Sequence, residues 1–400
     1  MTIPVSRRAA LLGAAALAAP LATPHLARGQ GAKLRLGVLT PLTGAGAFDG
    51  PRMLKAMQAV ATEVNAVGGV LGRQIELVVE DDETNPEAAV RAARKLIDVE
   101  KVPVIMGTWA SAVTTAVAPV CWESKTFLTT VSGADTITKL PHQGYLIRTQ
   151  PNNFLQASKH AEFIIRHASK RVFILSIQAP FTAPTQQRLT EVLTPKGVTV
   201  AGSLIYDKDK TSYRSEVDQA LKTSPDLLYL NGYAPDVGVV LRDLYRADYT
   251  GTKFTQSYAL TEKSLQELPK PVTEGVITVQ PSADVNSPAY AAAVQRLGIA
   301  APDSYEAQAT DWISIVCLTI ARAGQATGTA LRDTVRQITN SDGAKVYTAV
   351  DGLAALKSGK TIKYEGASGP CVFTEIGDII DCKFRYNQAA NGAFKFLEVA

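Results

Sequence analysis

The chain has 400 residues, of which 46% are hydrophobic and 20% charged, and its mean hydropathy of +0.03 is that of a soluble globular protein. This length exceeds what one hydrophobic core usually organises, so we expect two domains. The formal net charge is only +4, which argues against nucleic-acid binding, because that function needs clustered positive charge.

The first residues have the pattern of an export signal. Arg7 and Arg8 precede an apolar run at 9–19, and small residues follow as far as Ala27. This run is too short to span a bilayer in the mature protein. The arginine pair resembles a twin-arginine signal. We therefore expect residues 1–27 to be removed on export to a bacterial periplasm, which would lower the formal charge to +2. We expect no membrane insertion of the mature chain.

Strands and helices alternate in the first part of the mature chain. The helix that starts near Arg52 has apolar residues every three or four positions until Gly68 ends it. Asn85 and Pro86 fit the cap and first turn of the next helix. We expect strands at 34–39, 74–80, 102–107 and 127–131, with helices starting at 52, 86 and 111.

A second run of the same kind follows. We expect strands at 171–177, 198–206, 226–232 and 253–258, and helices at 215–223 and 235–247. Helices at 288–298 and 305–324 come next, and a strand-rich tail runs from 363 to the end. Two β/α runs of similar length predict an α/β protein of two similar lobes.

Ser111 stands at the position where such a fold binds ligands. Alternating strands and helices give parallel sheets, and ligands bind beyond the carboxyl ends of the strands. Ser111 follows a predicted strand and begins a helix. A hydroxyl group beside the free N–H groups of a helix N-terminus suits an anion. The alternative is that Ser111 only caps its helix.

Two of the four cysteines are placed for a disulfide. The segment CVFTEIGDIIDC at 371–382 indicates two short strands around a turn. Antiparallel pairing about that turn would set Cys371 opposite Cys382 at a distance that a disulfide can bridge. An oxidising compartment permits such a bond. Cys121 and Cys317 lie in apolar helical stretches, and we expect buried thiols there.

From about residue 33 to its end, the mature chain resembles the solute-binding proteins of bacterial ABC importers, in the branch that binds branched-chain amino acids. The motifs that carry the resemblance are LGVLTPLTG at 36–44, NAVGGVLGRQIELVVEDDETNPEAAV at 65–90, VIMGTWASAVTTAVAPV at 104–120, GYLIRT at 144–149, NGYAPDVGVVLR at 231–242 and YEGASGPCVFTEIGD at 364–378.

The resemblance implies a type I periplasmic-binding-protein fold, in which two Rossmann-like lobes are joined by a three-segment hinge and close over a ligand. The expected lobes are 33–150 with 281–365 and 151–280 with 366–400. The implied partners are a small organic acid or amino acid and the membrane permease and ATPase of an importer. The implied function is binding, without catalysis.

The family's binding residues map unevenly onto this chain. The serine that binds the ligand carboxylate falls on Ser111, and the next position, which offers backbone groups, falls on Ser132. A hydroxyl position falls on Ala134 and so loses its oxygen. The tyrosine that covers the ligand falls on Phe181, and a second tyrosine is kept as Tyr233. The first-loop contact falls on Asp49, and we expect Trp109 to line the cleft as well.

The largest departure is at Tyr258, where the resemblance implies an acidic partner for the ligand ammonium. Loss of the partner of a buried charge costs about 3–5 kcal/mol, whereas a cation over the tyrosine ring recovers only ~0.5–2 kcal/mol. We therefore expect a carboxylate with an apolar or aromatic body, unless Asp49 or Asp135 replaces the lost acid. Packing in the core is the alternative role for Trp109 and Phe181.

Two other classes of function remain as alternatives. Glycines at 44, 46 and 50 followed by acidic residues at 80–82 approach a dinucleotide-binding fingerprint, as in an exported oxidoreductase. Their spacing is one residue too long. No nucleophile elbow or zinc motif occurs in the sequence, so we expect no cofactor and no metal. A ligand-sensing receptor module for amides or urea-like solutes is the other alternative.

Overall fold

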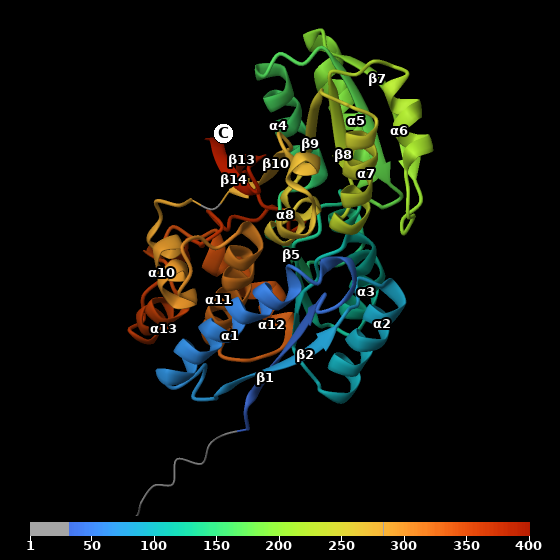
Figure 1. Ribbon diagram of the computed structural model, residues 1–400. Coiled ribbons are helices and arrows are strands. Elements are labelled where there is room, and N and C mark those ends of the chain that lie inside the picture. Colours follow the sequence, from blue (N-terminus) through green and yellow to red (C-terminus); the bar gives the residue numbers. More distant parts are fainter. Residues whose placement is uncertain (1–31, 283) are drawn as a thin grey trace, which may run out of the picture.

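The chain folds into two α/β lobes that lie one above the other in Figure 1. The computed structural model describes residues 32–282 and 284–400. The expected export signal at 1–27 lies outside these residues. Within the described residues, no helix is both long and apolar enough to cross a membrane.

A five-stranded parallel sheet forms the first lobe. Its strands are β1 (Leu34–Thr40), β2 (Ile75–Asp81), β3 (Val104–Gly107), β4 (Phe127–Thr130) and β5 (Leu146–Arg148). They lie in the order β2-β1-β3-β4-β5. The helices of this lobe are α1 (Gly50–Ala66), α2 (Pro86–Arg94), α3 (Ser111–Glu123), α10 (Pro288–Leu297), α11 (Ser304–Ala323), α12 (Gly328–Thr339) and α13 (Ala349–Lys357).

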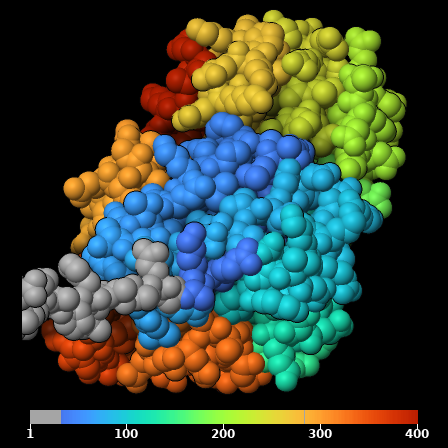
Figure 2. All heavy atoms as spheres, turned by 90° about the horizontal axis from the view of Figure 1, so that it is seen from below, coloured from blue at the N-terminus to red at the C-terminus, as the bar shows by residue number. Residues whose placement is uncertain are grey.

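Helix α11 is the central helix of the first lobe. Every residue from Ser304 to Ile320 is buried, which is typical of a helix surrounded by other elements. A capping box between Asp303 and Glu306 closes its N-terminus. Segments from both ends of the sequence thus share one core, and in Figure 2 the blue and orange segments lie side by side in this lobe.

A seven-stranded mixed sheet forms the second lobe. Its strands are β6 (Arg171–Ile177), β7 (Thr199–Tyr206), β8 (Leu227–Asn231), β9 (Thr252–Gln256), β10 (Ile277–Ser282), β13 (Lys383–Ala390) and β14 (Ala393–Val399). The order is β14-β13-β10-β9-β8-β6-β7. Strand β13 pairs antiparallel with both β10 and β14, and the other neighbours pair parallel. The helices are α4 (Asn153–Arg166), α5 (Thr182–Leu193), α6 (Arg214–Leu221), α7 (Ala234–Arg246), α8 (Glu262–Glu267) and α9 (Lys270–Thr273).

Most predicted elements are confirmed within two residues of their ends. Asn85 caps α2 through a 2.9 Å hydrogen bond from the Ala88 N–H to its side-chain oxygen, as its position predicts. The strand expected at 253–258 ends earlier, and Tyr258 lies in a short 3-10 turn. No bounds were predicted for β5, α4, α5, α8, α9, β10, α12, α13 or the small parallel pair of β11 (Ala344–Val346) and β12 (Ile362–Tyr364).

The chain passes between the sheets after β5, after β10 and before β13. The third boundary was expected at 365, but Cys371 and Phe373 pack in the core of the first lobe, which favours a later boundary. A bridge between Arg148 and Asp378 also attaches this segment to the first sheet. We propose the last lobe boundary after Ile379 and retain the other two as proposals.

The predicted disulfide between Cys371 and Cys382 is wrong: all four cysteines are free. The turn does form, but Phe373 pairs with Ile379, a register that sets Cys371 opposite residue 381. A shift of one residue turns side chains to opposite faces. The Cys371 thiol points to the carboxylate of Asp311, 3.7 Å away, whereas Cys382 directly precedes β13 in the other lobe. Cys121 and Cys317 are buried as predicted.

Candidate functional site

A cavity lies between the lobes, where several strands of both sheets end. Five predicted residues line it: Trp109, Ser111, Phe181, Tyr233 and Tyr258. About 470 Å³ of space lies between its atoms, but only about 30 Å³ is open to a water molecule. That room holds one or two waters. An organic ligand therefore requires the lobes to separate or the lining rings to move.

Helix α3 presents unused hydrogen-bond donors beside this cavity. Ala110 occupies its N-cap and supplies no capping side chain, although Ser, Thr, Asp or Asn is preferred there. Among the described residues, no acceptor bonds the N–H groups of Ser111 or Ala112. Ser111 is the first helical residue, and its hydroxyl accepts a 3.3 Å hydrogen bond from the Ala134 N–H. Ser111 therefore does not act as the helix cap.

Trp109 adds a further donor to the same wall, and Gly133 sets the position of the loop behind it. The indole nitrogen of Trp109 is buried and has no hydrogen-bond partner within the described part of the chain. Gly133 also lines the cavity, and a Cβ at this position would lie 2.3 Å from the Asn153 side-chain oxygen. Only glycine therefore lets the loop approach α4 this closely. A buried donor without a partner is costly unless a ligand satisfies it.

Aromatic rings from both lobes meet across the cavity. The Trp109 ring lies 5.2 Å from the Tyr233 ring and 5.8 Å from that of Tyr258, and Phe181 lies 5.8 Å from Tyr233. Tyr305, which the sequence did not point to, contacts Trp109 edge-on at 6.3 Å. Such contacts close the cleft with apolar surface.

Ser132 and Ala134 lie behind the wall of the cavity instead of lining it. The Ser132 hydroxyl donates to the Trp109 carbonyl at 2.9 Å. The backbone carbonyls of Ser132 and Ala134 both accept from the Arg148 guanidinium, at 3.1 and 2.6 Å. Arg148 thus draws both carbonyls inward, and direct contact of these two residues with a ligand stays a prediction.

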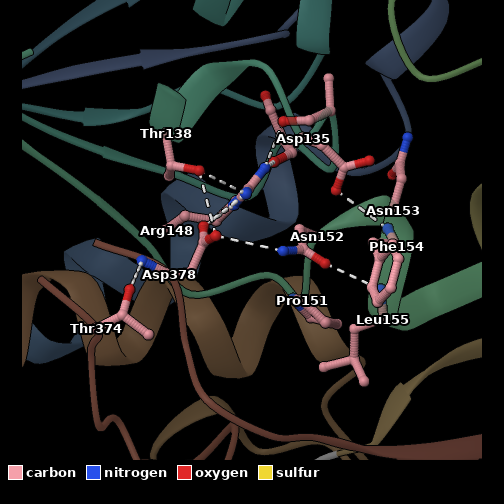
Figure 3. Close-up of polar contacts among 12 residues, drawn as sticks. Asp135, Thr138, Arg148, Pro151, Asn152, Asn153, Phe154, Leu155, Thr374 and Asp378 are labelled. Carbon is pink, nitrogen blue, oxygen red and sulfur yellow. Dashed lines mark hydrogen bonds and ion pairs between the residues drawn. The ribbon is translucent and has the colours of Figure 1, made fainter. Parts of the chain in front are cut away.

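Arg148 joins this loop to the third hinge segment (Figure 3). Its Nε and Nη2 donate to one oxygen of Asp378, at 2.8 and 2.5 Å. Thr138 and Asn152 donate to the other oxygen. Asn152 also caps α4, because its side chain accepts from the Leu155 N–H. One ion pair therefore connects the loop of Ser132 with two of the three hinge segments.

Three uncharged polar side chains, those of His160, Tyr229 and Gln256, line the part of the cavity beside α4. His160 and Tyr229 are joined at 2.8 Å, and Gln256 donates to the Tyr229 oxygen at 2.9 Å. Burial lowers the pKa of His160 to about 3, so its imidazole is neutral near pH 7. No motif in the sequence marked these residues, because they come from separate elements that only the fold brings together.

Asp49 and Asp135 do not reach this cavity. Asp135 accepts a 3.1 Å hydrogen bond from the Phe154 N–H at the start of α4. Asp49 lines a neighbouring cavity of about 240 Å³. Tyr258 and Tyr305 line both cavities and so form their shared wall.

The sequence matches the model of the periplasmic binding protein family over residues 33–374. A Leu/Ile/Val-binding protein from Rhizobium johnstonii is 27% identical over 58% of this chain and 62% of its own length. A substrate-binding protein of a chemotactic signal transduction system from Halobacterium salinarum is 27% identical over 85% and 83%.

Solved structures share the fold. A leucine-binding protein from Thermotoga maritima has a TM-score of 0.78 at 22% identity, over 92% of this chain and 98% of that one. A solute-binding protein of an ABC transporter from R. palustris, in complex with benzoate, has a TM-score of 0.75 at 18% identity, over 92% and 96%. These likenesses confirm the predicted type I fold.

Proposed function

The chain belongs to the periplasmic binding protein family, and from this membership we propose that it captures a small carboxylate between its lobes and delivers it to an ABC importer. Its relatives are solute-binding proteins, so it is a binding protein and not an enzyme. The dinucleotide alternative is therefore rejected. We propose the periplasm as its location, since the family is exported and residues 1–27 have the pattern of a signal.

One observation carries the proposal: donors without partners belong to residues that line the cavity. Ser111 begins a helix that no side chain caps, and the Trp109 indole N–H is buried without an acceptor. A helix N-terminus and a hydroxyl group favour an anion. Charge-assisted hydrogen bonds to a carboxylate would compensate for the cost of leaving these donors buried.

The opposite wall supports an apolar or aromatic body for this ligand. Rings of Phe181, Tyr233 and Tyr258 come from the second lobe, and among the described residues no carboxylate lines the same cavity. An α-ammonium group would be buried there without an anion. This would lower the affinity by a factor of between several and several thousand (~1–5 kcal/mol). The neighbour from R. palustris that holds benzoate agrees with this choice of ligand.

Sensing is a second candidate, favoured by one relative. The chemotactic substrate-binding protein of Halobacterium salinarum matches this chain over 85% of its residues. In that case, the same closed complex would dock on a receptor instead of a permease.

The test is calorimetric titration of ligand-stripped protein with benzoate and hexanoate. We expect the Ser111→Ala variant to bind both acids roughly tenfold more weakly, the loss of about one hydrogen bond to a charged group. The control is Ser124→Ala, since Ser124 is exposed at the other end of α3. Equal affinities of the wild type and the Ser111→Ala variant would contradict the carboxylate site.

A further inference from the structure

We propose that Asp49 binds a cationic group of the ligand, a primary ammonium or an amidinium, in the second interlobe cavity. For the other end of the solute, this inference rests on the proposed function, in which the ligand carboxylate binds near Ser111. Tyr258 and Tyr305 separate the two cavities. The solute is then an ω-amino carboxylate whose apolar middle passes these two rings.

The geometry of Asp49 carries the proposal. Its side chain is only 5% exposed and lines the cavity. Within the described part of the chain, its carboxylate has no hydrogen bond and no ion pair. It directly precedes α1, yet it does not cap that helix, because its own backbone is helical (φ −88°, ψ −39°). A buried carboxylate without a partner is costly and is rarely retained for structure alone.

The neighbouring charges leave Asp49 uncompensated. Arg52 is the nearest cation, but it is bound to Asp303 at 2.6 Å and to Glu306 at 3.0 Å. These four groups carry three negative charges and one positive charge when ionised. Glu262 and Arg385 face the cavity from the second lobe, and their charges cancel. A positive group of the ligand would therefore neutralise this part of the cleft.

The cavity suits an organic cation better than a metal ion. In the described residues, no group of three His, Cys, Asp or Glu side chains is arranged to hold a metal. The ring of Phe48 and the rings of Tyr258 and Tyr305 also line the space of about 240 Å³. Aromatic faces and one carboxylate are the usual surroundings of an alkylammonium group.

Binding is then linked to a proton. Burial, followed by the charge of Asp303, raises the pKa of Asp49 well above its usual value. A cationic group that binds next to Asp49 favours the ionised carboxylate. Binding of the ω-amino acid therefore releases a proton, and affinity rises with pH as long as the ammonium itself stays protonated.

The experiment compares matched ligands by calorimetry. The probes are 4-aminobutanoate, 5-aminopentanoate and 6-aminohexanoate, each paired with the parent acid and with the corresponding alkylammonium. We expect at least one ω-amino acid to bind the wild type roughly tenfold or more tightly than its parent acid. In Asp49→Asn this preference disappears, whereas Glu267→Gln, at an exposed position of α8 that lines neither cavity, retains it.

Two outcomes separate this inference from the proposed function. If Ser111→Ala weakens acids while Asp49→Asn changes nothing, the cation site is wrong and the carboxylate site stands. If Asp49→Asn removes alkylammonium binding while Ser111→Ala changes nothing, the carboxylate site is wrong and the cation site stands. Failure of every amine-bearing probe to bind more tightly than its parent acid overturns the inference.

Thermal stability gives a second readout that does not depend on the probes. Asp49→Asn and Asp49→Ser remove a buried carboxyl group that has no hydrogen-bond partner in the described part of the chain, so we expect melting temperatures equal to or above that of the wild type. A residue kept for binding at the expense of stability behaves in this way. Lower melting temperatures for both variants would assign Asp49 a structural role and overturn the inference.

Discussion

The guanidinium of Arg148 and the carboxylate of Asp378 form a buried ion pair that joins the ligand loop to the hinge. The Arg148 side chain is fully buried, and its Nη2 lies 2.5 Å from Asp378 Oδ1. Arg148 also holds the carbonyls of Ser132 and Ala134. The pair thus fixes the position of the loop that contacts Ser111, and it does so from segments that are distant in sequence.

Removal of this pair should destabilise the protein and weaken binding. Asp378→Asn leaves a buried guanidinium without its anion, which costs about 3–5 kcal/mol in the free energy of unfolding. Urea denaturation measures this change. The matched control is Glu267→Gln, which breaks the exposed pair with Lys263, and its effect should be below ~1 kcal/mol. Equal, small effects for both variants would show that the buried pair has no special role.

Restoring an acid at Tyr258 should change the ligand. Tyr258→Glu places a carboxylate where the family resemblance implies one, beside the rings of Trp109 and Tyr233. We expect leucine to gain roughly tenfold or more in affinity, because its ammonium acquires a partner. Calorimetry with leucine and 4-methylpentanoate measures the change, since the second compound lacks the ammonium. A gain for both compounds, or for neither, would refute the role given to Tyr258.

The buried imidazole of His160 should make stability depend on pH. Its pKa in the folded protein is about 3, whereas it is about 6.5 when unfolded. Below that value the unfolded chain binds a proton that the folded chain does not, so stability falls as pH falls. At about pH 5 the loss relative to pH 8 is about 2 kcal/mol from this group.

The variant His160→Gln isolates this contribution. Asp49 and Asp82, whose pKa values burial raises, oppose the trend, but they contribute equally to wild type and variant. The difference in unfolding free energy between the two proteins should therefore shift in favour of the variant by about 2 kcal/mol on going from pH 8 to pH 5. A constant difference would contradict a neutral buried His160.

Reducing agents should not change the stability. All four cysteines are free, and burial raises the pKa of Cys371 and of Cys121, which makes their thiols unreactive. We expect the same melting temperature with and without a reductant, and four titratable thiols after denaturation. A reductant-dependent decrease in melting temperature would point to a disulfide.

The sequence predicted those parts of the site whose position is set by the end of a strand or the start of a helix. Ser111 and Tyr233 follow β3 and β8 closely, and both line the cavity as expected. The sequence did not show that Ser132 and Ala134 lie behind the cavity wall, because Arg148, which turns their carbonyls inward, comes from β5, a short strand with no clear pattern. The cysteine pairing failed by one residue of register, which the sequence alone could not fix.

Other parts of the site depend on contacts between elements that are far apart in the chain. His160, Tyr229 and Gln256 come from α4, β8 and β9, and only the folded chain brings their side chains together. Asp49 was expected to contact the ligand in the cleft, but it lines a second cavity, and Tyr305 from α11 lies between the two. No local pattern predicts the position of such a side chain.

The most direct test of the central claim is calorimetric titration of the ligand-stripped protein with aromatic acids, their uncharged amides and leucine. We predict that at least one acid binds, that its amide binds roughly tenfold or more weakly, and that leucine binds more weakly still. Leucine binding below ~1 µM, or an amide that binds as tightly as its acid, would contradict the capture of a carboxylate at Ser111.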